Sequence, residues 1–182
     1  MAWVKRSIGI LSVLLIAAAA LCLHYYLPRH EVVHLTGVEV KRMDADGLIS
    51  AENPADGPTR DVYFIGTASA DAKRTVAVFR NEDTGWGFPW YFKFDSADVQ
   101  ALAQDLSRDS NQLAVIRYYG WRFQIFSMFP NITDIKATNS PSEPFPVFNT
   151  IFFGVLLVLG IAAALIVRRV LRRRHRPMVA GN

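Results

Sequence analysis

One stretch of the sequence carries the residue types of a metal centre, because His30, Glu31 and His34 form a literal H-E-x-x-H. On a helix this spacing directs both imidazoles to one zinc ion while the glutamate activates a bound water molecule. Here Pro28 precedes the motif and two β-branched residues lie inside it, which favours a strand. In a strand the two histidines would lie about 13 Å apart, too far for one metal ion. We therefore predict no zinc centre and no cofactor, and keep a surface metal site shared with His24 as an alternative.

A second stretch, Asn81 to Gly85 (NEDTG), has the acidic composition of a calcium loop. It lacks the ligand spacing of an EF-hand, so a solvated hairpin end is the preferred interpretation. The sequence offers no Ser-His-Asp set and no glycine-rich phosphate loop. Carboxylates such as Asp61, Asp95 and Asp98 are explained as turn and cap residues. The residues predict a protein that is not an enzyme.

Aromatic density is the feature that most needs a functional explanation. Six of the nine residues from Trp86 to Phe94 are aromatic, and so are six of the twelve from Tyr118 to Phe129. One interpretation places half of these rings in the core, with two tryptophans anchored at the lipid headgroup layer. The other makes them a hydrophobic surface for a partner protein or lipid. Both stay open, and the candidate partner- or lipid-binding residues are Trp86, Phe88, Trp90, Tyr91 and Trp121.

Two uncharged apolar runs flank the segment that holds all these residues. Ser7 to Leu27 is 21 residues long, and Phe148 to Val167 is 20. Either run would be roughly 30 Å long as a helix, which matches one hydrocarbon thickness. A cleaved signal peptide is the alternative for the first run, but its length favours an uncleaved anchor. The sequence therefore predicts a membrane protein whose middle part is exported.

Charge segregates along the chain in a way that predicts the orientation of both spans. The 182 residues have a net charge of +4, yet Pro28 to Val147 holds all 16 acidic residues against 12 basic ones. Basic flanks stay cytoplasmic, so both termini should lie inside. An acidic middle argues against nucleic acid as a partner. The basic tail is the candidate site for anionic lipids, through Arg168, Arg169, Arg172, Arg173, Arg174 and Arg176.

These boundaries predict six segments along the chain. They are a cytoplasmic N-terminus (1–6), a first span (7–27), an exported domain (28–137), a linker (138–147), a second span (148–167) and a basic cytoplasmic tail (168–182). The one cysteine, Cys22, lies within the first span, so the exported domain must be stable without an intrachain disulfide.

Within the exported domain the periodicity is mostly that of strands. Strands are expected at Glu31 to Met43 with a bend at Gly37, at Asp61 to Thr67, at Thr75 to Arg80, at Leu113 to Tyr119 and at Ile132 to Ala137. Arg122 to Phe129 is expected to be extended, and Asp44 to Pro58 to form turns. One helix begins near Asp95 or Ser96, with an apolar stripe of Val99, Leu102, Ala103 and Leu106.

The predicted order is β-β-β-α-β-β, which is the order of the small five-stranded barrel called the OB-fold. We therefore expect an α+β protein with a small antiparallel OB-like β-barrel between two transmembrane helices. A plain antiparallel sheet carrying one helix is the alternative.

Four motifs carry a resemblance to a known family: NEDTGWGFP (81–89), YFKFDSAD (91–98), YGWR (119–122) and FPN (129–131). They resemble a family of proteobacterial membrane proteins defined as a domain of unknown function. The resemblance implies a protein of the bacterial inner membrane with a periplasmic domain, and it implies no activity.

Two functional hypotheses follow. The first is an accessory or scaffold protein of the cell envelope, whose periplasmic domain engages another membrane protein, or a second copy of the chain, through the aromatic loop. The second is a module that binds lipid, glycan or a small ligand at the periplasmic membrane surface.

Overall fold

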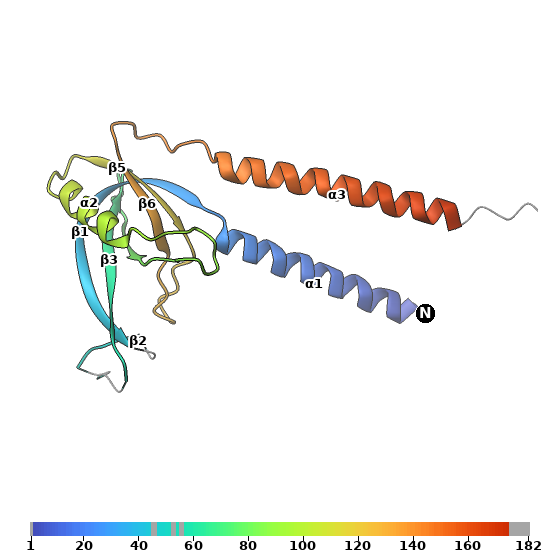
Figure 1. Cartoon of the computed structure of the whole chain (residues 1–182), viewed down its shortest axis with the longest axis horizontal. Coiled ribbons are helices and arrows are strands. Elements are labelled where there is room, and N and C mark those ends of the chain that lie inside the picture. The colour runs from blue at the N-terminus through green and yellow to red at the C-terminus, as the bar shows by residue number, and fades with distance from the viewer. Residues whose placement is uncertain (1, 45–46, 52–53, 55–56, 175–182) are drawn as a thin grey trace, which may run out of the picture. The chain divides into compact units, whose positions relative to one another are not determined.

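The computed structural model describes residues 2–44, 47–51, 54 and 57–174, and Figure 1 shows the arrangement of their elements. It forms two compact units, one ending at Pro144 and one beginning at Phe145. The first unit contains the helices α1 (Ala2–Tyr26) and α2 (Ser96–Leu106), and the second contains α3 (Val147–Arg174). The strands are β1 (Arg29–Asp44), β2 (Gly47–Leu48), β3 (Arg60–Ser69), β4 (Val76–Asn81), β5 (Leu113–Tyr119) and β6 (Asn131–Thr138).

Five of the six strands form a sheet that closes into a ring. The order β1-β3-β4-β6-β5 returns to β1, because β1 is long enough to pair with two neighbours. Arg29 to His34 pairs with β5, while the part of β1 from Val33 to Met43 pairs with β3. The predicted order of five strands and one helix is confirmed for these five strands and α2. The two-residue strand β2 is an addition, because it pairs with the end of β1 inside the segment expected to form turns only. The sheet is mixed rather than antiparallel, however, because β4 and β6 pair in parallel at Arg80 and Asn131.

The predicted bend in the first strand is present as a bulge. The register between β1 and β3 shifts between Leu35 and Gly37. Gly37 has a φ of 152°, a conformation that residues with a β-carbon rarely adopt. Across the bulge, a β-carbon on Gly66 would lie 2.6 Å from the Thr36 hydroxyl oxygen, so the Thr36 side chain occupies the space that a side chain at position 66 would need. Glycine at both positions lets β1 bend from one neighbour to the other.

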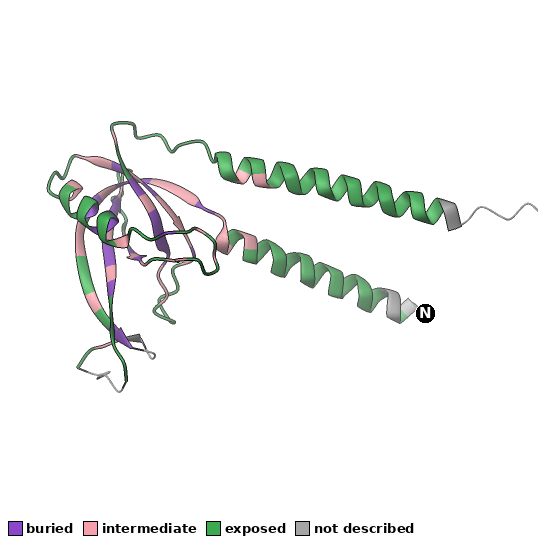
Figure 2. Cartoon of the chain, in the orientation of Figure 1, coloured by how far each residue is buried: buried purple, intermediate pink, exposed green. Residues whose placement is uncertain are grey.

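The core lies inside the ring and is covered by α2. Figure 2 shows the buried residues gathered on the strands and on one side of α2. The central cluster is apolar and is formed by Val33, Leu35, Ile65, Phe79, Val99, Ala103, Ala114, Ile116, Ile132 and Ile135. Burial of such side chains contributes about 1.5–3 kcal/mol each. The ring is therefore a rigid platform for the loops at its ends.

Two local predictions are wrong. Helix α2 buries Val99, Gln100 and Ala103, whereas Leu102 is 39% exposed, so the buried stripe is rotated and includes a polar residue. Residues 122–129 form turns with a single bridge between Phe123 and Met128 instead of a strand. In α2, Gln100 is buried because Asn81 donates a hydrogen bond to it. In residues 122–129 the chain turns back on itself, because Phe123 and Met128 exchange backbone hydrogen bonds and the Arg122 guanidinium donates to the Met128 carbonyl at 2.8 Å.

Helices α1 and α3 are each long and apolar enough to cross a membrane. The candidate spans are Arg6–Tyr26 and Val147–Arg172, and neither is buried by the rest of the chain. An exposed apolar helix of this length is stable in a bilayer, where its backbone groups are satisfied internally. The predicted spans fall within these two helices, except that Leu27 lies one residue past the end of α1.

Candidate functional site

The end of α1 is fixed to the β-domain by hydrogen bonds to its last backbone carbonyls. The amide of Gly120 donates to the carbonyl of Tyr25 at 2.8 Å, and the Tyr91 hydroxyl donates to the carbonyl of Tyr26. The guanidinium of Arg29 donates in turn to the carbonyl of Gly120. The last carbonyls of a helix have no partner within the helix, so these contacts satisfy groups that would otherwise need water. The helix end and the domain thus form one joined structure.

Two aromatic loops meet around this helix end. In the loop that follows β4, Phe88 lies with its ring centroid 4.6 Å from Tyr26 and 5.3 Å from Trp90. In the turn that follows β5, Trp121 lies 5.2 Å from Tyr25 and donates to the His24 imidazole at 2.7 Å. Tilted and edge-to-face contacts of this kind are favourable for aromatic rings.

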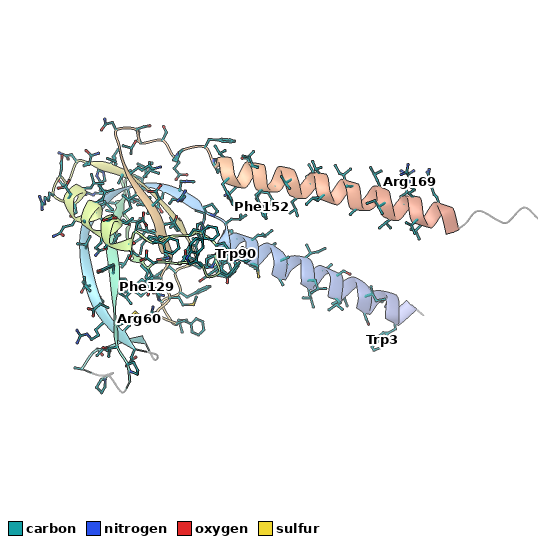
Figure 3. The ribbon with its side chains drawn as sticks, viewed as in Figure 1. Trp3, Arg60, Trp90, Phe129, Phe152 and Arg169 are labelled. Atoms are coloured by element: carbon teal, nitrogen blue, oxygen red, sulfur yellow. The ribbon has the colours of Figure 1, made fainter. Side chains whose placement is uncertain are left out.

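We call the exposed rings of these loops the aromatic collar, and it comprises Trp86, Phe88, Trp90, Phe92, Phe94, Trp121, Phe123 and Phe126. Trp86 is 80% exposed and Trp90 is 68% exposed, while Trp121 is half-buried against α1. Figure 3 shows Trp90 beside the domain-side end of α1. None of the five phenylalanine and tryptophan rings from Trp86 to Phe94 is buried, so this loop supplies no such ring to the core. In the second aromatic stretch, by contrast, Tyr118 and Phe129 pack against the core clusters.

Each of the two collar loops has a residue other than glycine in the left-handed backbone region, Phe92 in the first and Ser127 in the second. Phe92 has a φ of 51°, in the left-handed region, and its side chain is exposed. A residue other than glycine costs about 1–2 kcal/mol in that conformation. Its ring contacts Trp86 at a centroid distance of 5.7 Å but gains little burial in return.

Beneath the collar, a buried lysine ties the loop to the core. The Lys93 ammonium donates to the side-chain oxygen of Asn81 and, at 2.8 Å, to the carbonyl of Ile132. Asn81 also donates to Gln100 of α2 at 3.1 Å. Burial lowers the pKa of Lys93 to about 8, because the charged form loses its hydration there.

The acidic turn at residues 81–85 serves internal contacts. Asp83 accepts hydrogen bonds from the amide and the hydroxyl of Ser96, both at 2.9 Å, and so fixes the start of α2. Asp95 occupies the N-cap position but makes no side-chain cap hydrogen bond. The expected local cap is therefore replaced by a carboxylate from the preceding loop.

A polar cavity of about 250 Å³ lies next to the collar. It is lined by Tyr25, Arg60, Arg80, Glu82, Asp83, Thr84, Phe88, Pro89, Tyr119, Phe129 and Asn131. Glu82 bridges two arginines, with 2.8 Å to Arg60 and 2.7 Å to Arg80. The position of Arg60 at the start of β3 and that of Phe129 are visible in Figure 3. The cavity is thus lined both by ion-paired side chains and by aromatic rings.

A tyrosine pair connects the cavity to the helix end. Tyr91 and Tyr119 stack with ring centroids 4.8 Å apart, and Asn131 donates to the Tyr119 hydroxyl at 3.3 Å. Burial raises the pKa of both tyrosines, so both remain neutral hydrogen-bonding groups at ordinary pH.

Comparison with known proteins places the chain in a family. Residues 4–171 match the family described as "Protein of unknown function (DUF1523)". The chain belongs to the DUF1523 family. It is also 54% identical over 124 residues to an uncharacterized protein of Haemophilus influenzae, covering 66% of this chain and 70% of that protein. No solved structure matches the chain.

In this DUF1523 protein the H-E-x-x-H stretch lies in a strand, as predicted. His30, Glu31 and His34 belong to β1 and pair with Arg117, Ile116 and Leu113 of β5. Burial raises the pKa of Glu31, and it lowers the pKa of His30. Among the described residues, no group of three or more His, Cys, Asp or Glu side chains could hold a metal ion.

The structure brings the predicted aromatic residues together and adds residues that the sequence did not reveal. Trp86, Phe88, Trp90, Tyr91 and Trp121 all lie in the two loops at the end of α1. Arg60, Arg80, Glu82 and Lys93 were missed, since their relevance depends on contacts between distant segments.

The candidate anionic-lipid residues are only partly described. Arg168, Arg169 and Arg172 lie on the last turns of α3 and are exposed, and Figure 3 shows Arg169. Arg173 and Arg174 belong to the same helix, while Arg176 lies outside the described residues. Their role in binding anionic headgroups stays a prediction.

Proposed function

We propose that this DUF1523 protein is a non-enzymatic membrane-interface module whose aromatic collar lies in the lipid headgroup layer. In this proposal α1 and α3 span the bacterial inner membrane, with both termini cytoplasmic. The β-domain, an OB-like barrel in this interpretation, lies on the periplasmic surface. Its activity is to hold and present lipid at that surface.

The observation that carries the proposal is the position of the collar around the end of α1. Phe88 and Trp121 contact Tyr26 and Tyr25, which belong to the last turn of a helix long enough to span a bilayer. If α1 spans the membrane, the collar must lie at the level where the helix leaves the hydrocarbon. Aromatic side chains are enriched at that level because they combine an apolar body with polar or polarisable edges.

The energetics of the collar also favour insertion into lipid. The rings of Trp86 and Trp90 contact only neighbouring rings of their own loop and stay mostly exposed, and Phe92 adds backbone strain. A ring transferred from water to an apolar environment gains about 1.5–3 kcal/mol. A bilayer interface supplies part of that gain to the rings that lie beside the end of α1, of which Phe88 and Trp121 contact it directly.

Quenching of tryptophan fluorescence by spin-labelled lipids tests this proposal. The full chain, with Trp90 as its single tryptophan after Trp3, Trp86 and Trp121 are each replaced by Phe, is reconstituted in nanodiscs. We expect strong quenching by a label at the headgroup and weaker quenching by a label deep in the acyl chain. The control is the tryptophan-free chain carrying Gln104→Trp on α2, a helix on the far side of the domain from α1, and it should not be quenched (Figure 1).

The outcome decides between lipid and a protein partner. Equal and weak quenching of Trp90 and of the α2 control would overturn insertion into lipid. A stoichiometric protein adduct to a photo-crosslinking residue at position 90, found together with that result, would favour the accessory or scaffold hypothesis instead.

A further inference from the structure

We propose that the polar cavity beside the collar binds the headgroup of a zwitterionic phospholipid of the phosphoethanolamine class. The proposal rests on the proposed function, since it requires the collar to lie in the headgroup layer. It assigns a ligand class to a site built from Arg60, Arg80, Glu82 and Asp83.

The position of the cavity makes it accessible to lipid. Its lining includes Tyr25 on the last turn of α1, together with Phe88 and Pro89 of the collar loop. A lipid lying against the end of α1 could therefore enter the cavity with its headgroup while its chains remain in the bilayer. A lipid headgroup could not reach charged groups that lie deep in the domain and far from α1.

The charges of the cavity are balanced, which argues for a zwitterion. Arg60 and Arg80 supply two guanidinium groups, and Glu82 and Asp83 supply two carboxylates. Arginine binds phosphate oxygens through charge-assisted hydrogen bonds, and carboxylates accept hydrogen bonds from an ammonium group. A headgroup with only a negative charge would leave the two carboxylates facing it, and a free cation would leave the two arginines without a new partner.

The two arginines of the cavity remain partly accessible. The side chain of Arg80 is 25% exposed beside Glu82. The side chain of Arg60 is 64% exposed and holds Glu82 from one side, so it can turn toward a phosphate at little cost. Glu82 would then keep its 2.7 Å contact with Arg80 while its second oxygen accepts from the ethanolamine ammonium.

The size of the cavity fits a headgroup rather than a larger ligand. Its volume of about 250 Å³ is below the range of about 300–1,000 Å³ found for drug-sized ligands. A phosphate joined to a two-carbon amine is of this smaller class. A primary ammonium has three N–H donors for the two carboxylates, whereas the trimethylammonium group of choline has none.

Native mass spectrometry of the full chain in mild detergent tests this proposal. The protein is titrated with phosphatidylethanolamine, phosphatidylcholine or phosphatidylglycerol of the same acyl chains. We expect one phosphatidylethanolamine per chain, bound about tenfold more tightly than phosphatidylcholine. Soluble phosphoethanolamine and inorganic phosphate, added as competitors, separate recognition of a lipid from recognition of a free anion.

Two arginines of similar exposure provide a matched pair of variants. Arg60 has a side chain 64% exposed, and Arg42, paired with Asp61, has one 65% exposed. Arg60 and Asp61 are adjacent in β3, so their side chains point to opposite faces of the sheet. Arg60→Gln should weaken phosphatidylethanolamine binding about tenfold, and Arg42→Gln should leave it unchanged.

A third variant tests the role of the carboxylate. Glu82→Gln should abolish the preference for ethanolamine over choline and strengthen binding of phosphatidylglycerol, because one anionic group is removed from the cavity. The melting temperature of each variant checks that it folds, and Glu82→Asp retains the charge if Glu82→Gln does not fold.

Equal binding of phosphatidylethanolamine and phosphatidylcholine, or equal effects of Arg60→Gln and Arg42→Gln, would overturn the proposal. Full displacement of the lipid by inorganic phosphate alone would reduce the site to one for a free anion and would also overturn it. Trp90 quenching separates the two proposals. If quenching is normal while lipid selectivity is absent, the cavity proposal fails and the membrane-interface function stands.

Discussion

The amide of Gly120 donates a 2.8 Å hydrogen bond to the carbonyl of Tyr25, which joins the end of the first apolar helix to the end of β5. The bond depends on a backbone conformation with φ at 92°, and a β-carbon at this position would lie 3.3 Å from the Cα of Pro130. Both restrictions favour glycine, because the conformation and the close approach exclude a side chain. The joint between helix and domain thus depends on one residue of the YGWR motif.

We predict that Gly120→Ala weakens this joint and destabilises the domain by about 1–3 kcal/mol, as expected for strain at a restricted backbone position. Thermal unfolding followed by near-ultraviolet circular dichroism measures the change. Gly57→Ala is the control, because a β-carbon there meets nothing within 4 Å. Equal melting temperatures for the two variants would show that the joint does not depend on Gly120.

Lys93 predicts a pH dependence of stability with a defined sign. Burial lowers its pKa to about 8 in the folded protein, from an ordinary value of 10.5 in the unfolded chain. Between these values the unfolded chain binds more protons, so the free energy of unfolding should rise as pH increases, by about 2 kcal/mol between pH 8 and pH 10.

Chemical denaturation at several pH values measures this rise, and Lys93→Met should abolish it. Measurements should stop near pH 10, since burial raises the pKa of Tyr118 and Tyr119, and such groups lower stability once the unfolded tyrosines ionise. A wild-type protein whose stability is constant or falls across the window would contradict the assignment of Lys93 as a buried, titrating group.

The rotated stripe of α2 gives a prediction about packing. Val99 is 6% exposed within the central cluster, whereas Leu102 is 39% exposed. Val99→Ala should lower the free energy of unfolding by about 2 kcal/mol, from lost apolar burial and a residual cavity. Leu102→Ala removes more atoms yet should cost less. If denaturant melts showed a larger loss of unfolding free energy for Leu102→Ala than for Val99→Ala, Leu102 would belong to the buried face, as the sequence alone predicts.

The periodicity of the sequence predicted the strands of the ring well, but it did not predict the contacts of the candidate site. The strands are short, rich in β-branched residues and bounded by turn residues, and Leu113 to Ile116 of β5 also alternates in burial, so the strand positions and order could be predicted. Leu102 was misplaced because Gln100, a polar residue, is buried by its bond to Asn81. The parallel pairing of β4 and β6 and the Arg60–Glu82–Arg80 bridge join segments distant in sequence, and no local pattern reports such contacts.

The H-E-x-x-H stretch yields a prediction about metal content. Since His30 and His34 lie four residues apart in β1, they cannot bind one zinc ion together. Purified protein should contain no stoichiometric zinc, and Glu31→Gln should fold normally, because burial of the Glu31 carboxylate already disfavours its charged form. Elemental analysis that finds one zinc per chain, lost in Glu31→Gln, would contradict this prediction.

The last prediction separates an exposed collar from a hydrophobic core. Phe64 is 2% exposed, and Phe64→Ala should cost about 3–5 kcal/mol, as truncation of a buried ring does. Trp86→Ala and Trp90→Ala should each change stability in detergent by less than about 0.5 kcal/mol, as is usual for surface positions.

In nanodiscs, however, the two tryptophan substitutions should reduce the protection of the loop amides from hydrogen exchange, which Phe64→Ala should not affect. Hydrogen exchange of the amides from residue 86 to residue 94 should slow when the wild-type protein moves from detergent to a bilayer, because the loop becomes buried in the headgroup layer. Trp86→Ala combined with Trp90→Ala should remove most of that protection. If the double variant instead melts like Phe64→Ala and retains the protection, these rings stabilise the domain and the collar is not the surface that contacts lipid.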